Sequence, residues 1–141
     1  MAVLKFNDVG MTAMAACVPP KKYFNKDLNQ LMSEEEVETL INSIGVKERR
    51  LAEPEVTSSD LCYKAAKRLM EDCQIAPESI DMLIFLSLTP DYVAPPTSSV
   101  LQHRLGLPTT CGAFDMSLAC SGFVYALATA FSFASNPAIN R

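Results

Sequence analysis

Two kinds of apolar pattern alternate along the chain. The run from Ile80 to Leu88 is apolar almost throughout, as expected for a parallel strand that is covered on both faces. Before it, every fourth residue from Leu61 to Cys73 is apolar and lines one face of a helix. Because strand and helix patterns alternate in this way, the sequence predicts an α/β fold with a mostly parallel sheet.

Capping and turn residues set the expected boundaries of the other elements. Gly45 should end a helix whose first turn is acidic, and Thr57 with Asp60 resembles a capping box. Prolines exclude regular structure from the loop after the apolar strand. We expect a long, bent strand at 3–18, a helix capped by Asn25 that runs to Leu31, a helix at 33–44, an extended segment at 46–52, a helix at 57–73, the strand at 80–88, the loop at 89–96, a helix at 97–105, a strand at 111–116 and a helix at 119–134.

The last predicted helix, residues 119–134, is rich in Ala, Phe and Leu and carries no charge. A helix that is apolar all round is expected to be buried on every side. The chain shows no linker and no low-complexity stretch, so we expect residues 1–141 to form one domain, or a piece of one.

Composition narrows the class of protein. The chain is 49% hydrophobic and 20% charged, which is a globular balance, and its net charge of −4 argues against a nucleic-acid surface. No apolar run reaches the roughly 20 residues needed to cross a bilayer, and the N-terminus lacks the plan of a signal peptide. We therefore expect a soluble cytoplasmic protein with no nucleic-acid or membrane partner.

The five cysteines separate into one candidate and four ordinary thiols. An odd number, with no C-x-x-C spacing and one histidine, argues against a disulfide framework and against a zinc site, so we expect no metal. Cysteine is commonly a small buried hydrophobe. We expect this role for four of them and ask whether Cys120 differs; the four are Cys17, Cys62, Cys73 and Cys111.

Cys120 lies where a predicted strand turns into the last helix. The thiolate is the reactive form of cysteine, and a helix N-terminus favours negative charge there. Backbone N–H groups at that end can also stabilise an oxyanion, and the small neighbours Ala119, Ser121 and Gly122 leave room for a substrate. On this pattern alone, a catalytic nucleophile competes with a buried structural thiol.

A longer match surrounds this turn. Residues 113–127, AFDMSLACSGFVYAL, resemble the nucleophile motif of the β-ketoacyl-acyl carrier protein synthase III family, which has the thiolase fold. GVKERR at 45–50, and the strand at 80–85 followed by Thr89 and Pro90, resemble two further segments of that family in the right order. The resemblance covers most of the chain and identifies Cys120 as the catalytic nucleophile.

The resemblance implies a two-stage reaction and a homodimer. Cys120 would take an acyl group from a coenzyme A or acyl carrier protein thioester, and malonyl-acyl carrier protein would then lose carbon dioxide and attack it. No tightly bound cofactor is implied. In the family, the loop matching residues 89–96 crosses the dimer interface, and a His and an Asn from the second half of a duplicated fold serve the second stage.

The chain departs from the family pattern in two respects. Its histidine, His103, precedes the nucleophile, and the chain stops at Arg141, before the family's next core strand. We therefore expect only the N-terminal half of a thiolase-like fold, able to be acylated but unable to condense alone. Thr39 and Ser43 stand where family members hold coenzyme A with Trp and Arg, so the donor is either held differently or is a carrier protein; Arg49 is a weaker candidate contact.

Two rival hypotheses remain. The chain could come from a thiolase-fold acyltransferase that uses another acceptor, or it could be a non-catalytic fragment that acts only as an interaction module. In either case a partial fold leaves the last helix short of neighbours. We expect the chain alone to expose a large apolar patch or to oligomerise.

Overall fold

The computed structural model describes residues 3–27 and 32–141. These residues form two compact units, each of which is described by itself. Residues 3–17 and 58–141 make the first unit, and the described residues of 18–57 make the second. The prediction of one domain therefore stays a prediction.

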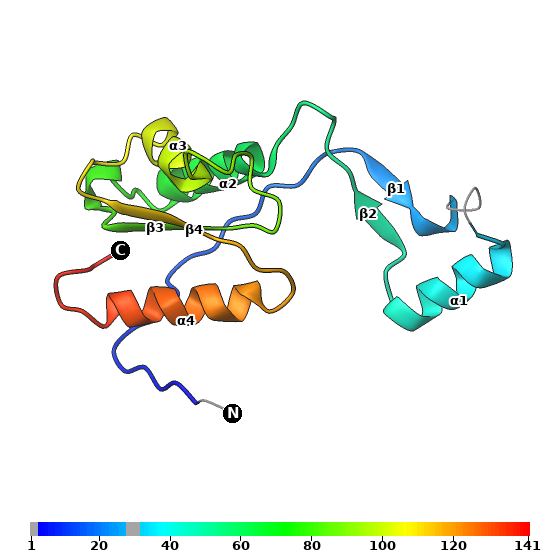
Figure 1. Ribbon diagram of the computed structural model, residues 1–141, viewed down its shortest axis with the longest axis horizontal. Coiled ribbons are helices and arrows are strands. Elements are labelled where there is room, and N and C mark those ends of the chain that lie inside the picture. Colours follow the sequence, from blue (N-terminus) through cyan, green and yellow to red (C-terminus); the bar gives the residue numbers. More distant parts are fainter. Residues whose placement is uncertain (1–2, 28–31) are drawn as a thin grey trace. The chain divides into compact units, whose positions relative to one another are not determined.

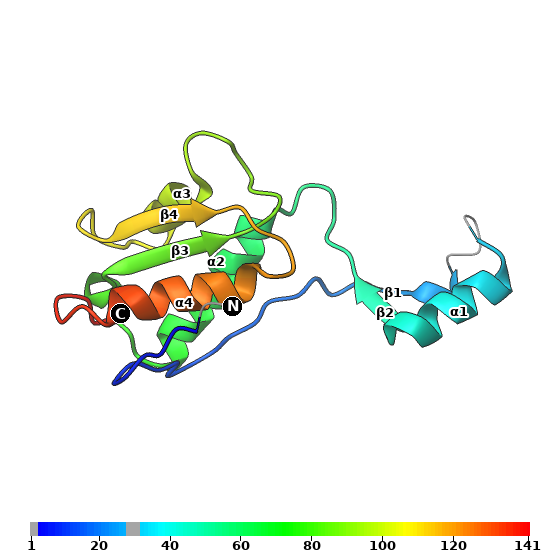
Figure 2. The ribbon, with the colours of Figure 1, turned by 60° about the horizontal axis from the view of Figure 1, so that its bottom comes forward.

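The first unit is built on two parallel strands, β3 (Met82–Leu86) and β4 (Gly112–Met116). They pair in register from Met82 opposite Gly112 to Leu86 opposite Met116. Figures 1 and 2 show the helices α2 (Ser58–Asp72) and α3 (Thr97–Arg104) on one face of this pair and α4 (Gly122–Ala134) on the other. The parallel pairing and the α/β class are confirmed.

Burial is concentrated between the strands and α3. Phe85 of β3, Leu101 of α3 and Cys111 just before β4 are all buried. A short 3-10 helix, Pro77–Ser79, leads into β3, and the carbonyl oxygen of Arg141 accepts the N–H groups of Asp81 and Met82 at 2.7 and 3.0 Å. These bonds lie at the amino end of β3. The carboxyl ends of β3 and β4 lie at the opposite edge, where β4 leads into the turn before α4.

The second unit is a two-stranded antiparallel sheet whose strands are separated along the chain by a helix. Strand β1 (Lys22–Phe24) pairs with β2 (Glu48–Arg50), and α1 (Glu34–Ile44) lies between them in sequence. Ser33 and Glu36 form a full capping box, and Gly45 ends the helix with a φ of 71°, which a glycine adopts without strain. The predicted helix and extended segment are confirmed here.

Two predicted elements are wrong or only partly seen. Residues 3–18 are not a strand: they form no regular element, and the ring of Phe6 instead packs edge-on against Phe131 of α4, 5.6 Å between centroids. A strand needs a hydrogen-bonded partner, and within the described residues β3 pairs only with β4. A 3-10 helix is described from Asn25 to Asp27, and residues 28–31 of the predicted helix lie outside the described part.

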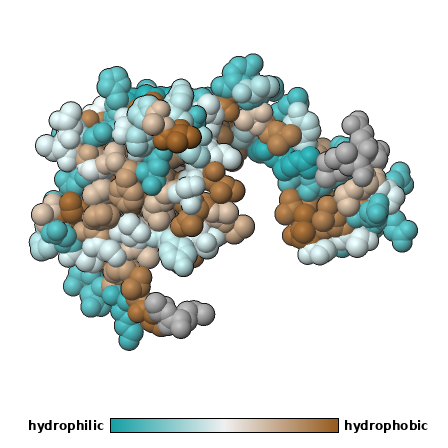
Figure 3. Space-filling view, viewed as in Figure 1, coloured by the Kyte–Doolittle hydropathy of each residue, from teal (hydrophilic) through white to brown (hydrophobic). Residues whose placement is uncertain are grey.

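The prediction that the last helix is buried on every side is also wrong. Phe123, Val124 and Tyr125 of α4 are 59%, 68% and 59% exposed. Apolar colouring is spread over the surface of the unit that contains this helix (Figure 3). The composition of α4 is that of a buried helix, but β3 and the segment that holds Phe6 leave these three side chains exposed, which agrees with the expected apolar patch. In the described residues, no helix has the length and apolar character to cross a membrane.

Candidate active site at Cys120

Cys120 lies in the turn between β4 and α4. Figure 2 shows the course of the chain between these two elements. The helix begins later than predicted, at Gly122 with Ser121 as its N-cap, so Cys120 stands one residue before the cap. The N–H of Gly122 donates to the carbonyl oxygen of Ala119 at 2.9 Å, which closes the turn around the cysteine. The residue is exposed, as are Ala119 and Ser121. A substrate can therefore reach the sulfur without displacing a large side chain.

The position of this turn follows from the parallel pairing. The N–H of Ser87 donates to the carbonyl oxygen of Met116 at 3.1 Å, so the ends of β3 and β4 are held together. Ligands of α/β proteins bind beyond the carboxyl ends of parallel strands. Cys120 occupies that edge, beside the N-terminus of α4, where the helix dipole favours negative charge.

The other cysteines have different surroundings, and one expectation about them is wrong. Only Cys111 is buried; Cys17 is half-buried, whereas Cys62 and Cys73 are exposed. Desolvation raises the pKa of the Cys111 thiol, with a smaller contribution from Asp81. The pKa of Cys62 is also raised, first by the groups that desolvate it and then by the nearby Asp91.

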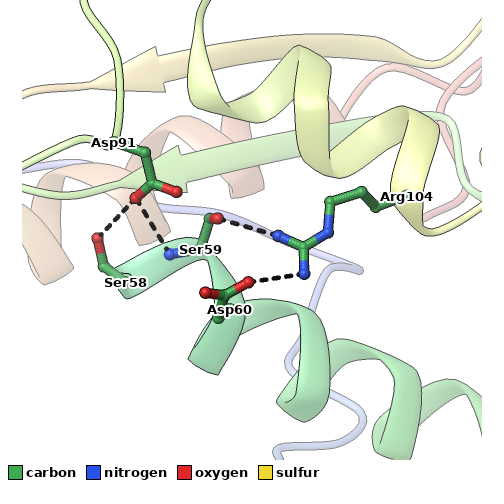
Figure 4. Close-up of polar contacts among 5 residues, drawn as sticks. All are labelled: Ser58, Ser59, Asp60, Asp91 and Arg104. Atoms are coloured by element: carbon green, nitrogen blue, oxygen red, sulfur yellow. Dashed lines mark hydrogen bonds and ion pairs between the residues drawn. The ribbon is translucent and has the colours of Figure 1, made fainter. Parts of the chain in front are cut away.

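A polar network holds the base of the loop that follows β3 (Figure 4). One carboxylate oxygen of Asp91 accepts from Ser58 Oγ and from the N–H of Ser59, both at 3.3 Å. Arg104 of α3 donates to Ser59 Oγ at 3.2 Å and to Asp60 at 2.8 Å. These contacts tie the loop to the start of α2 and to the end of α3.

Beyond this anchored base, the loop projects outward. Tyr92 is 56% exposed and Val93 is 99% exposed. The resemblance implies an interface role for this loop, and the alternative is a simple surface turn. Apolar side chains held in solvent by an ordered base favour the interface role, which stays a prediction.

One structural residue near the site escaped sequence analysis. Asp115 of β4 accepts the N–H groups of Thr97 and Ser98, both at 2.8 Å, and so caps α3. The available signal was an acid inside an otherwise apolar strand, one residue from its end. Asp115 thus couples the strand that leads to Cys120 with the helix that follows the loop.

The structure also places His103 and Arg49, two other residues considered from the sequence as possible site residues. His103 is exposed in the last turn of α3. In the second unit, the guanidinium of Arg49 donates to Asn25 Oδ1, so the weaker candidate for donor binding already has a partner within its own unit. Across residues 3–27 and 32–141, no three His, Cys, Asp or Glu side chains gather as metal ligands would.

Comparisons with known proteins give a consistent picture, although no protein-family model matches. Two curated β-ketoacyl-[acyl-carrier-protein] synthase III sequences, from the Y51 and DCB-2 strains of Desulfitobacterium hafniense, are 42% and 41% identical over 125 residues. These matches cover 89% of this chain but 37% of each relative. The chain thus spans a little over a third of the length of the curated relatives it matches.

Solved structures match over a similar share of the chain. A 3-oxoacyl-(acyl-carrier protein) synthase from Burkholderia xenovorans superposes with a TM-score of 0.83 at 36% identity, over 89% of this chain and 37% of that one. An OleA variant from Xanthomonas campestris gives 0.83 at 26% identity, over 95% and 41%.

The fold of this chain is therefore that of the corresponding part of the thiolase-fold condensing enzymes. Within that class, the matching curated relatives are β-ketoacyl-acyl carrier protein synthases III, and the resemblance seen in the sequence is confirmed. The predicted nucleophile, Cys120, stays a prediction at this point.

Proposed function

We propose that Cys120 accepts an acyl group as a thioester in the first stage of a condensing reaction. The thiolate sulfur attacks the carbonyl carbon of an acyl-thioester, the bond from that carbon to the donor sulfur breaks, and the donor thiol leaves. The observation that supports this step is an exposed thiol between β4 and α4 in a chain homologous to condensing enzymes. Covalent catalysis of this kind divides one difficult condensation into two easier steps.

The second stage belongs to the proposed whole enzyme. Malonyl-acyl carrier protein would lose carbon dioxide, and the resulting carbanion would attack the acyl carbonyl on Cys120. A β-ketoacyl-acyl carrier protein would form and the thiol would be released, as in fatty-acid or related biosynthesis. We propose that the residues stabilising the enolate come from outside this chain, so the chain alone accepts an acyl group without condensing it.

A homodimer is part of the proposal. Its support is the exposed pair Tyr92 and Val93 on a loop whose base is fixed by Asp91. A docking role without catalysis is the second candidate, and the observation that favours it is the exposed apolar side of α4. The two candidates differ in whether Cys120 reacts.

Intact-mass spectrometry after incubation with acetyl-coenzyme A, and separately with an acyl-acyl carrier protein, tests the proposal. We expect one acyl adduct per chain, absent from Cys120→Ala and retained in the matched variant Cys62→Ala, which removes another exposed thiol. The donor that gives the faster adduct identifies the donor class. An adduct that survives Cys120→Ala, or no adduct with either donor, would leave the docking role as the better account.

A further inference from the structure

The first residue of α4 lies unusually close to the last residue of β3. Gly122 is buried, and a β-carbon at this position would lie 2.8 Å from Leu86 Cδ1 and 3.1 Å from Leu86 Cδ2. It would also lie 3.1 Å from the β-carbon of Leu118. β-carbons in proteins essentially never approach another heavy atom within 3.0 Å. A side chain here would require the end of Leu86 to turn aside and the neighbouring Leu118 to give way by a few tenths of an ångström.

Backbone conformation does not explain this glycine. Among the described residues, the glycines with positive φ are Gly45 and Gly106, so Gly122 has a backbone that other residues also adopt. Its requirement is therefore one of space. The space is filled by Leu86, the last residue of β3. This strand pairs with β4, which leads to Cys120.

A side chain at position 122 would have to displace something. The end of Leu86 can turn aside in part, but the β-carbon of Leu118 is attached directly to the backbone of the turn. The remaining relief is an outward movement of the first turn of α4. Because the N–H of Gly122 is bonded to Ala119, such a movement carries with it the turn that holds Cys120.

We propose that Gly122 is a positioning residue for Cys120: its contact with Leu86 sets where the thiol is presented to an acyl donor. The inference rests on the proposed acylation of Cys120. Nucleophilic attack needs the reacting atoms about 3–3.5 Å apart and aligned, and a misplacement of about 1 Å can cost roughly a hundredfold in rate. A contact that controls how closely α4 approaches β3 therefore controls the reaction.

The test compares acylation rates of four variants of the full chain. Gly122→Ala is expected to lower the rate constant at saturating acyl donor by roughly ten- to a hundredfold, with little change in the half-saturating donor concentration. Combining it with Leu86→Ala removes the side chain in the way and should restore most of the rate. Leu86→Ala alone removes the contact that sets how closely α4 approaches β3, so it should lose part of the rate that the double variant regains.

Gly112→Ala is the matched control. A β-carbon at Gly112 would lie 2.8 Å from Met82 Sδ, so this variant introduces a comparable clash at the opposite end of the same two strands. It should lower the stability without a selective effect on acylation of the folded chain. A rate loss equal to that of Gly122→Ala would show that any clash against β3 suffices, and it would overturn the proposal.

Amide NMR spectra separate this inference from the proposed function. The resonances of residues 119–123 should shift in Gly122→Ala and return in the double variant, whether or not the chain is acylated. If the wild type gives no adduct, the proposed function fails and these shifts alone decide the positional claim. Unmoved shifts, a Gly122→Ala chain as fast as the wild type, a double variant that is not restored, or failure of both to fold would each overturn it.

Discussion

The cysteines of the chain differ in exposure and in thiol pKa because their surroundings differ. Cys120 stands in an exposed turn among small residues, whereas Cys111 is enclosed by the core and Cys62 is desolvated beside Asp91. Desolvation disfavours a charged thiolate; it comes from burial at Cys111 and is partial at the exposed Cys62, where Asp91 adds to the effect. Both pKa values are therefore raised, and both residues stay neutral thiols further into the alkaline range than an ordinary cysteine.

The free energy of unfolding should fall as the pH rises above about 9. The folded pKa values of Cys62 and Cys111 lie above the ordinary value of 9.0, so the unfolded chain loses these protons first and is stabilised by doing so. Urea unfolding at pH 8 and pH 10 should show this loss, and it should be smaller in Cys62→Ala. Cys73→Ala, which removes another exposed thiol, is the control; equal losses in both variants would contradict the assignment to Cys62.

Among the elements, α1 is the one whose boundaries were most completely predictable. Its signals are local: Ser33 and Glu36 bond to each other across the first turn, and Gly45 ends the helix. The opposite case is the predicted strand at 3–18, because a strand exists only when a partner strand lies beside it. Local chemistry determines a helix cap, and distant pairing determines a strand.

The capping box makes a prediction that NMR can check. The N–H of Ser33 and then its hydroxyl lower the pKa of the Glu36 carboxyl below its ordinary 4.5, so the helix gains stability that is present above that value and lost as the pH falls through the lowered pKa. Carboxyl titration should therefore give Glu36 a midpoint below 4.5. Ser33→Ala should move this midpoint upward.

Ser33→Ala should also lower the free energy of unfolding by about 1 kcal/mol, the usual cost of losing an N-cap. Glu35, in the same first turn, is the internal control for the titration because it shares the helix terminus but not the hydrogen bonds with Ser33. A Glu36 midpoint that is unchanged by Ser33→Ala would contradict the role assigned to the box.

In the molecule as a whole, α4 has the composition of a buried helix, but part of its apolar surface is exposed. The helix carries no charge, yet Phe123, Val124 and Tyr125 face solvent. Contiguous apolar surface of this kind marks a place where another surface packs. The chain alone should therefore bind a hydrophobic dye and self-associate.

Val124→Lys should weaken that association, because it places a charge in the middle of the exposed side. Sedimentation velocity and dye fluorescence provide the measurements. Ser132→Lys adds the same charge to another exposed position of α4 without removing apolar surface, so it should leave the association near the wild-type level. A monomeric wild type with no dye binding would contradict the prediction.

The sequence alone determined the α/β class, most helix boundaries and the turn that carries Cys120, because these depend on the period of apolar residues and on neighbours within a few positions. The tertiary structure decided which strand has a partner, which side of α4 is covered, and how near α4 comes to β3. Those depend on residues distant in the sequence, such as Leu86 against Gly122. Cys120 could therefore be singled out from its own segment, whereas the contact proposed to position it became visible only when β3 and α4 were brought together.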